Sequence, residues 1–386
     1  MAPADRRDEV FEVVIAGGGI AGLEAALALH ELAAERVAIT LITPDAEFRY
    51  RPLAVREPFT ATRSASYPMS AIAQAAGARL VTARFKWLDP DARIVHTDTG
   101  QEYPYDALVI ALGGNAHRLF RGVTTIDDSR IGEQLADFVA GLDAGSIQSV
   151  AFVVPSLPIW SLPAYELALM TATRAPARGQ QVEVLLITPE DSPLAALGID
   201  ASVEVARVLA QSGVTTITSA SSQIREPGKI NLYPIRRSLD VDEVIALPEL
   251  YAPSVPGVPT SAERGFLTID QQCGVPGLDR VFAAGDITDT PVKHGGQAAE
   301  QGVVAAQAIA ALAGAEVRPQ PPRPSLHVML LGGAEPLFIR SRMLGDHGVD
   351  AEVSHKPLWK PIGMLHSEYL GPCLARLEPR SAAAER

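Results

Sequence analysis

Residues 11–22 read FEVVIAGGGIAG, and this stretch decides the fold. Residues 11–16 form a short apolar, β-branched run that is typical of a buried parallel strand. Three glycines follow at the spacing G-x-G-x-x-G, and the next residues, 23–32 (LEAALALHEL), predict a helix. A second apolar run at residues 37–42 predicts the next strand. The chain therefore starts with a βαβ unit whose first turn is rich in glycine.

The three glycines have separate physical roles. Gly17 allows the tight turn, Gly19 lets the backbone approach a pyrophosphate, and Gly22 lets the helix pack closely on the strand. The N–H groups at the start of the helix, including those of Ile20 and Ala21, then face the anion. The pattern predicts a dinucleotide site, and the alternative is a glycine-rich turn that binds nothing.

The end of the second strand departs from the usual pattern. That strand normally ends in Asp or Glu, whose carboxylate binds the adenosine ribose. Here Thr43 stands at that position, and Asp45 follows two residues later. We expect the Thr43 hydroxyl to bind the ribose with less charge assistance, and Asp45 to face solvent.

Two later segments repeat the combination of an apolar strand and glycine. Residues 105–114 read YDALVIALGG, and residues 280–286 read RVFAAGD. Asp286 ends the second of these strands, and a carboxylate there is expected to have a partner because an unpaired buried charge is costly. An alanine-rich helix is predicted to begin near Lys293, and the proline-rich residues 318–324 predict a linker.

Composition excludes several classes of protein. The 386 residues include 33 basic and 45 acidic side chains, and this net charge of −12 argues against binding to nucleic acid. Only two cysteines, Cys273 and Cys373, are present, which excludes a disulfide-stapled fold and favours a reducing cytoplasm. The eight histidines lack ligand spacing, so no metal is expected. No apolar run is long enough to predict a transmembrane helix.

The ordered segments resemble those of a known group of flavoproteins. Residues 13–22, 105–113 and 281–286 are similar to segments of the pyridine nucleotide-disulfide oxidoreductase type, with two dinucleotide-binding domains. This group includes glutathione reductase, sulfide:quinone oxidoreductase and type II NADH dehydrogenase. The resemblance spans about residues 10–312. It implies an α/β fold like that of glutathione reductase, with two Rossmann-like three-layer (ββα) domains and a small C-terminal region.

The resemblance also implies domain bounds and a cofactor, FAD. The FAD-binding domain is expected over residues 10–120 and 265–320, the second, degenerate dinucleotide-type domain over 121–264, and a C-terminal flap or interface region over 321–386. The residues expected to bind FAD are Gly17, Gly19, Ile20, Ala21, Gly22, Thr43, Arg51, Pro52, Ala83, Ala111, Gly113, Gly285, Asp286, Lys293, Gly295 and Gly296.

Within this group, the chain resembles the sulfide:quinone oxidoreductase and type II NADH dehydrogenase branch. Residues 48–53, FRYRPL, are similar to an aromatic-Pro-Leu segment that passes near the flavin in that branch. The disulfide reductases need two redox cysteines on the helix after the glycine turn, and residues 23–32 contain none. Thiol–disulfide reductase activity is therefore excluded.

The second domain lacks the usual nicotinamide turn. The strand predicted at residues 149–154 is followed by PSLPIWSLP at 155–163, which has three prolines and no glycine. Proline offers no N–H to a phosphate, and side chains at the glycine positions block close approach. Residues 163–166, PAYE, resemble a helix start of sulfide:quinone oxidoreductase, but no cysteine lies near this turn to carry sulfur. Sulfide oxidation by that route is not expected.

Glu166 and Lys293 are the candidate catalytic residues. Glu166 could exchange a proton near flavin N5 or a quinone oxygen, or its carboxylate could simply cap the helix that it starts. Lys293 could stabilise the reduced flavin, pair with a carboxylate, or be a solvated surface residue. Trp160, Tyr165 and Trp359 are expected to line a substrate pocket, with ordinary core packing as the alternative.

The sequence thus predicts an FAD-dependent oxidoreductase with a small-molecule electron donor and a quinone-like or protein acceptor. Two alternatives stay open: an enzyme that binds NAD(P)H without the glycine turn, and a flavin-binding scaffold or electron-transfer partner without turnover. Residues 358–370 predict a flap over the flavin or a homodimer contact, in preference to a membrane-associated helix.

Overall fold

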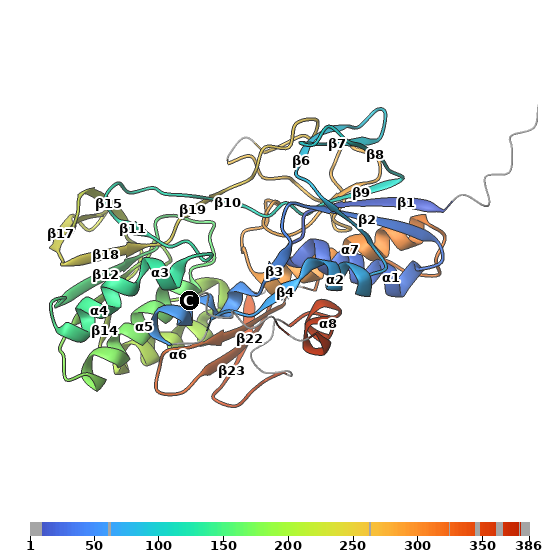
Figure 1. Ribbon diagram of the computed structural model, residues 1–386. Coiled ribbons are helices and arrows are strands. Elements are labelled where there is room, and N and C mark those ends of the chain that lie inside the picture. The colour runs from blue at the N-terminus through green and yellow to red at the C-terminus, as the bar shows by residue number, and fades with distance from the viewer. Residues whose placement is uncertain are drawn as a thin grey trace, which may run out of the picture.

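The computed structural model describes residues 10–60, 63–261, 264–323, 325–343, 348–359, 366–377 and 379. Two parallel five-stranded sheets organise this part of the chain (Figure 1). The strand order in the first sheet is β20-β9-β1-β2-β5. Its strands are β1 (Phe11–Ala16), β2 (Val37–Thr43), β5 (Arg79–Thr82), β9 (Ala107–Ile110) and β20 (Val281–Ala283). The glycine-rich residues 17–22 follow β1 at the centre of this sheet.

The first sheet is the middle of three layers. Val13 and Ile15 of β1 belong to the core on the helical face, whereas Val14 and Ala16 belong to the core on the opposite face. This alternation with a period of two is typical of a strand buried on both faces. The helical layer contains α1 (Ile20–Ala33), α2 (Met69–Ala75) and α7 (Gly295–Leu312), and the other layer contains β6 (Phe85–Asp89), β7 (Ile94–Thr97) and β8 (Glu102–Pro104).

The second sheet repeats this arrangement with the order β11-β18-β12-β13-β14. Its strands are β11 (Thr124–Thr125), β12 (Ser149–Val153), β13 (Glu183–Ile187), β14 (Val214–Ile217) and β18 (Glu243–Ala246). One face packs on α3 (Ile131–Gln134), α4 (Ala136–Ala144), α5 (Leu162–Ala177) and α6 (Ile199–Gln211), and the other on β15 (Ser221–Glu226), β16 (Lys229–Tyr233) and β17 (Arg237–Asp240). Both predicted three-layer ββα domains are confirmed.

The two domains are joined by an antiparallel strand pair, β10 (Asn115–His117) with β19 (Glu249–Tyr251), which runs between them (Figure 1). This pair corrects the expected boundary at residues 264/265. Val255 and Val258 already pack in the core of the first domain, and the Leu88 N–H donates to the Pro256 carbonyl at 2.9 Å. The chain therefore returns to the first domain directly after β19.

The C-terminal region contacts both domains. Its antiparallel sheet contains β21 (Ser325–Leu330), β22 (Leu337–Met343) and β23 (Val349–Ser354), and Leu326, Val328 and Ile339 pack in the core of the second domain. The last helix, α8 (Leu370–Arg376), lies against α1 of the first domain (Figure 1). Residues 360–365, which the expected flap includes, lie outside the described residues.

Four short elements complete the described fold. They are β3 (Glu47–Arg49), which pairs with β4 (Ser66–Pro68), and the 3₁₀ helices η1 (Arg51–Phe59) and η2 (Ala195–Leu197). Within the described part of the chain, no helix is long and apolar enough to cross a membrane.

Candidate functional site

The glycine turn between β1 and α1 is shaped for close backbone approach. Gly17 has a φ of +121°, and a Cβ atom there would lie 2.1 Å from the Ala111 carbonyl oxygen. A Cβ atom at Gly22 would lie 2.0 Å from the Gly17 carbonyl oxygen. A Cβ atom at Gly19, in contrast, would meet no described atom within 4 Å. Gly17 and Gly22 are therefore required for packing, whereas Gly19 leaves open space above the turn.

The start of α1 borders that open space. Gly19 is the N-cap residue, and none of the described side chains caps this helix end. The N–H groups of Ile20 and Ala21 belong to the first turn, where no intrahelical acceptor is available. Free amides at a helix N-terminus favour a bound anion such as a pyrophosphate. The turn therefore fits the phosphates of a dinucleotide.

The residue in the position of the ribose-binding acid, Thr43, lies beneath this turn. It is 1% exposed, and its Oγ1 accepts a hydrogen bond from the Asp45 N–H at 3.3 Å. A Cβ atom at Gly18 would lie 2.7 Å from the same oxygen. Asp45 is exposed, as expected. That Thr43 binds a ribose stays a prediction.

The other predicted cofactor residues gather at the carboxyl ends of the first sheet. Ala83 follows β5 and donates its N–H to the Thr43 carbonyl at 3.2 Å, and Ala111 follows β9. Gly113 has a φ of +71° and faces space free of described atoms within 4 Å. Gly285 follows β20, and its N–H donates to Gln301 Oε1 at 2.7 Å. This bond ties the end of β20 to α7.

Charged residues surround the end of β20. Burial raises the pKa of Asp286, while the cations Lys293 and Arg51 oppose that shift and Asp128 adds to it. Arg51 and Pro52 begin η1 and are both exposed. Loss of solvation raises the pKa of Asp128 as well, and Arg51 opposes that shift. Asp128 belongs to no motif, so the sequence gives no signal that it joins this group.

Lys293 is buried and not a solvated surface residue, which corrects one of its three interpretations. The residue is only 6% exposed. Its Nζ donates hydrogen bonds to the backbone carbonyls of Asp286, at 3.2 Å, and of Thr288. The ammonium also lies 3.8 Å from the centre of the Phe266 ring. Burial lowers the pKa of Lys293 to about 8. Lys293 therefore fixes the loop that carries Asp286.

The N-terminus of α7 follows Lys293 directly. His294 is its N-cap residue, and its Nδ1 accepts the N–H of Gly296 at 3.1 Å. Burial lowers the pKa of His294 to about 4, so this imidazole is neutral near pH 7. Gly295 begins the helix, and the buried Gln297 Oε1 has no hydrogen-bond partner among the described atoms. An unpaired buried acceptor is costly, so Gln297 is suited to a ligand that donates a hydrogen bond.

Glu166 lies in the second turn of α5 and does not cap that helix, which corrects the capping interpretation. It is 3% exposed, and its Oε1 accepts the Leu331 N–H at 3.0 Å. That is its one hydrogen bond to the described residues. Burial raises the pKa of Glu166 to about 8, against weaker effects of this bond and of Arg56. Glu166 can therefore hold a proton near neutral pH.

A second buried carboxylate, Glu190, was missed in the sequence. It follows β13, the second strand of the second βαβ unit, where a ribose-binding acid is usual. Here three hydroxyl groups of the chain donate to it: Ser161 Oγ at 3.0 Å, Tyr165 OH at 2.7 Å and Thr188 Oγ1 at 2.9 Å. The position after this strand was the signal that could have identified it.

The proline-containing turn borders a cavity of about 560 Å³. Three segments line it: residues 157–161, residues 189–197 around Glu190, and residues 289–292 of the first domain. Of the three expected pocket residues, only Trp160 lines it. Tyr165 is fully buried behind Glu190, and Trp359 packs on Phe338 of the C-terminal sheet at a ring distance of 5.4 Å. The three rings therefore do not line one pocket.

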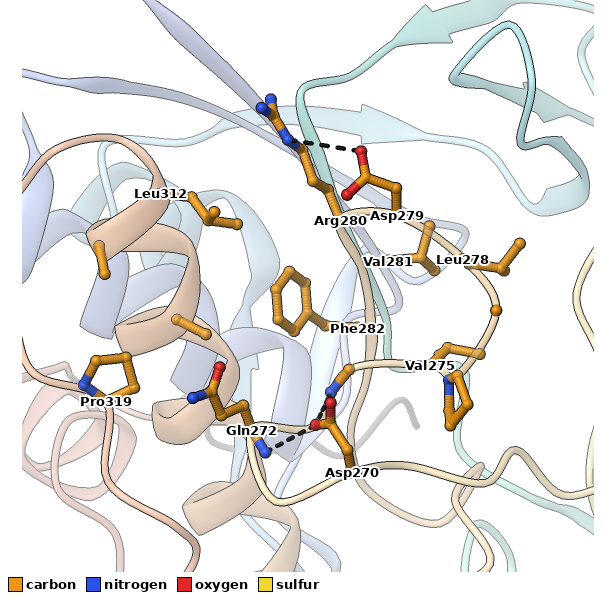
Figure 2. A pocket seen from close by; sticks show the side chains of 15 residues that line it. Asp270, Gln272, Val275, Leu278, Asp279, Arg280, Val281, Phe282, Leu312 and Pro319 are labelled. Atoms are coloured by element: carbon orange, nitrogen blue, oxygen red, sulfur yellow. Dashed lines mark hydrogen bonds and ion pairs between the residues drawn. The ribbon is translucent and has the colours of Figure 1, made fainter.

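A cavity of similar size, about 550 Å³, lies elsewhere (Figure 2). It borders the beginning of β20 and the last turns of α7, at the sheet edge away from the glycine turn. Its carboxylates are already used. Asp270 accepts the N–H groups of Gln272 and Gly274, and Asp279 pairs with Arg280 (Figure 2). It offers no convergent free polar groups, so it is not the candidate site.

Comparison with known proteins places this geometry in a family. The model of the pyridine nucleotide-disulphide oxidoreductase family matches residues 11–308. An NADH dehydrogenase-like protein of Mycobacterium tuberculosis is 27% identical over 290 residues, which cover 71% of this chain and 72% of that protein. The sulfide-quinone reductase of Aquifex aeolicus is 25% identical over 301 residues, which cover 72% of this chain and 69% of that protein.

Solved structures agree on the fold. The sulfide:quinone oxidoreductase of Aquifex aeolicus superposes with a TM-score of 0.79 at 20% identity, covering 90% of this chain and 87% of that chain. A ferredoxin reductase of Rhodopseudomonas palustris superposes with a TM-score of 0.62 at 17% identity, covering 86% of this chain and 83% of that chain. With the family model matching most of its length, the chain belongs to the pyridine nucleotide-disulphide oxidoreductase family and is an FAD-dependent oxidoreductase.

Proposed function

We propose that this flavoprotein takes electrons from a small-molecule donor other than NADH or NADPH and passes them to a quinone-like or protein acceptor. The observation that carries this proposal is the pair formed by the proline-containing turn and the internally bonded Glu190. One relative reduces quinone by its name, and another is named as similar to NADH dehydrogenase. The second domain of this chain supports a donor other than a nicotinamide dinucleotide.

The chain is suited to hold FAD at the first sheet. The amides of Ile20 and Ala21, with the open side of Gly19, fit the pyrophosphate. Asp286 and the N-terminus of α7, where Gln297 Oε1 has no described partner, would hold the rest of the cofactor. Bound FAD supplies the two-electron chemistry, and the protein supplies position, proton transfer and exclusion of water.

Two features of the second domain disfavour a nicotinamide dinucleotide. Pro155, Pro158 and Pro163 offer no N–H groups to a pyrophosphate. Glu190, in the position that would bind a ribose, already accepts three hydroxyl groups of the chain. A ribose would have to displace these donors, so the βαβ frame remains while its nucleotide contacts are lost.

Glu166 is the proposed proton carrier. A two-electron reduction of a quinone consumes two protons, and a group with a pKa near the working pH delivers them most efficiently. Burial raises the pKa of Glu166 to about 8. Its Oε1 is held by the Leu331 N–H of the C-terminal region, which leaves Oε2 to carry the proton. The C-terminal sheet therefore orients this carboxyl group.

A half-reaction that needs no natural donor tests this proposal. The flavin of the purified protein is reduced with stoichiometric dithionite and mixed anaerobically with a soluble ubiquinone analogue in a stopped-flow instrument. We expect oxidised-flavin absorbance to return, and Glu166→Gln to slow that return by at least about tenfold. Glu243→Gln is the matched control. Glu243 is the first residue of β18, at the amino end of the second sheet, whereas Glu166 lies in the helix that follows the carboxyl end of β12. Equal rates in all three proteins would remove Glu166 from this role, and no reoxidation would reject a quinone acceptor.

A further inference from the structure

The cavity beside the proline-containing turn is built mainly from apolar side chains. Leu157, Ile159 and Trp160 come from the turn, Leu194 and Leu197 from the segment after β13, and Val292 from the first domain. A volume of about 560 Å³ is in the range of sites for small organic molecules. The walls come from both domains, so an occupant would contact each of them.

The charge in this cavity has one sign. Glu190, Asp191 and Asp289 line it, and none of the described residues that line it is basic. The Glu190, Asp191 and Asp289 carboxylates accept bonds from hydroxyl groups. Burial raises the pKa of Glu190, so the negative charge of the cavity rests chiefly on Asp191 and Asp289. The nearby ammonium of Lys293 interacts electrostatically with Asp289, but it donates its hydrogen bonds to the carbonyls of Asp286 and Thr288. The cavity therefore attracts cations and repels phosphates or carboxylates.

Trp160 adds an aromatic surface to the same cavity. Its ring meets the His294 ring at a centroid distance of 4.8 Å and an interplanar angle of 62°. His294 is neutral near pH 7, because burial lowers its pKa to about 4. The neighbouring imidazole therefore carries no positive charge that would compete with a ligand cation for the Trp160 indole. Indole faces attract ligand cations, and this attraction grows when the site is shielded from water.

We propose that this cavity binds a small organic amine in its cationic form, with the apolar body against Leu157, Leu194 and Trp160 and the ammonium group between Asp191 and Asp289. The site stands where relatives with a glycine turn would be expected to bind a dinucleotide, but its chemistry selects the opposite charge. This inference goes beyond the proposed function, because it concerns binding and does not depend on which acceptor the protein reduces.

Calorimetric titration of the FAD-loaded protein tests the inference with three phenyl-bearing probes of similar size. These are 2-phenylethylamine, the neutral 2-phenylethanol and the anionic 3-phenylpropionate. We expect the amine to bind at least about tenfold more tightly than the alcohol, and the anion not to bind. Equal affinity for the amine and the alcohol, or no binding of the amine, would overturn the proposal.

Variants assign the binding to this cavity. We expect Asp191→Asn combined with Asp289→Asn to weaken the amine about tenfold and to leave the alcohol unchanged. Asp240→Asn combined with Asp279→Asn, two exposed aspartates outside the cavity, changes the net charge equally and should leave both affinities unchanged. Trp160→Leu should weaken the amine, whereas Trp87→Leu, on β6, should not. Unchanged amine affinity in the first double variant contradicts the site.

Because calorimetry needs no redox reaction, failure of the quinone experiment is distinguishable from failure of this one.

Discussion

At the scale of single residues, the glycine turn separates packing from binding. A Cβ atom at Gly22 meets the Gly17 carbonyl, whereas a Cβ atom at Gly19 meets only open space. Gly19 has a φ of −85°, which alanine also adopts. The two glycines should therefore respond differently to the same substitution.

We predict that Gly19→Ala weakens FAD binding by at least about tenfold and changes the unfolding free energy of the apoprotein by less than about 1 kcal/mol. The new methyl group would occupy the space intended for the pyrophosphate. Flavin fluorescence on dilution measures the binding, and urea unfolding measures the stability. Gly22→Ala is the comparison, and it should lower both. Full FAD affinity in Gly19→Ala would place the pyrophosphate elsewhere.

Glu166 should make stability depend on pH. Its pKa rises from 4.5 to about 8 on folding, so between these values the folded state holds a proton that the unfolded state has lost. The contribution of Glu166 to stability is therefore greatest below pH 4.5 and falls as the pH rises, by up to about 1.4 kcal/mol per pH unit.

Urea unfolding of the wild type and of Glu166→Gln at pH 5, 6 and 7 checks this prediction. Glutamine has no proton to lose, so the stability of the variant relative to the wild type should increase with pH. Other titrating groups cancel in this difference. Parallel stability curves would show that Glu166 titrates normally and would weaken its role as a proton carrier.

The site residues that sequence reasoning missed are fixed by tertiary contacts and burial. The roles of Gly17, Gly19 and Gly22 follow from local spacing, which a sequence displays directly. Glu190 and Gln297 depend on tertiary placement, since Glu190 is bonded by Tyr165, 25 residues away. The burial of Lys293 also depends on tertiary structure, because its Nζ donates a hydrogen bond to the Asp286 carbonyl in the loop after β20.

At the scale of elements, one carboxylate connects the first helix, α1, to the last described helix, α8. Glu24 of α1 is fully buried and accepts the N–H groups of Glu368, Tyr369 and Leu370, which lead into α8. These are the N–H groups that a helix start leaves without intrahelical acceptors. A side chain from another helix thus caps α8 and holds it on the first domain.

Glu24→Gln should loosen α8, because an amide accepts fewer of these bonds and places its own NH₂ against N–H donors. We expect a cost of about 2–4 kcal/mol in the free energy of unfolding. Cys373, a buried residue of α8, should also react faster with a thiol reagent. Cys273 is the internal control, since it is buried in the first domain and burial raises its pKa to about 12. Equal labelling of Cys373 in variant and wild type contradicts this anchoring.

Strands with strong apolar patterns were predictable, and those fixed by tertiary pairing were not. β1, β2 and β12 are apolar runs, and each lies within a residue or two of its expected range. β10 and β19 have three residues each and exist because they pair across more than 130 positions. After that pairing the chain packs on the first domain, earlier than the bounds implied by the resemblance.

At the scale of the whole molecule, two similar domains differ in the polar groups that they leave open to a ligand. The first retains the glycine turn and the open space above it. The second retains the sheet, the helices and Glu190, the acid after its second strand. Hydroxyl groups of the chain itself donate hydrogen bonds to the Glu190 carboxylate. The overall fold and the proline-containing turn of the second domain could be predicted from the sequence, whereas the hydroxyl contacts of Glu190 become visible only in the structure.

Anaerobic titration of the purified yellow protein with NADH and then NADPH, followed by flavin absorbance, tests this account most directly. The turn with three prolines and the occupied Glu190 predict that neither nucleotide bleaches the flavin within the time of catalytic turnover, while dithionite reduces it fully. Dithionite bleaching establishes that the flavin is accessible and intact, so it serves as the control. Rapid, stoichiometric bleaching by NADH or NADPH would contradict the account.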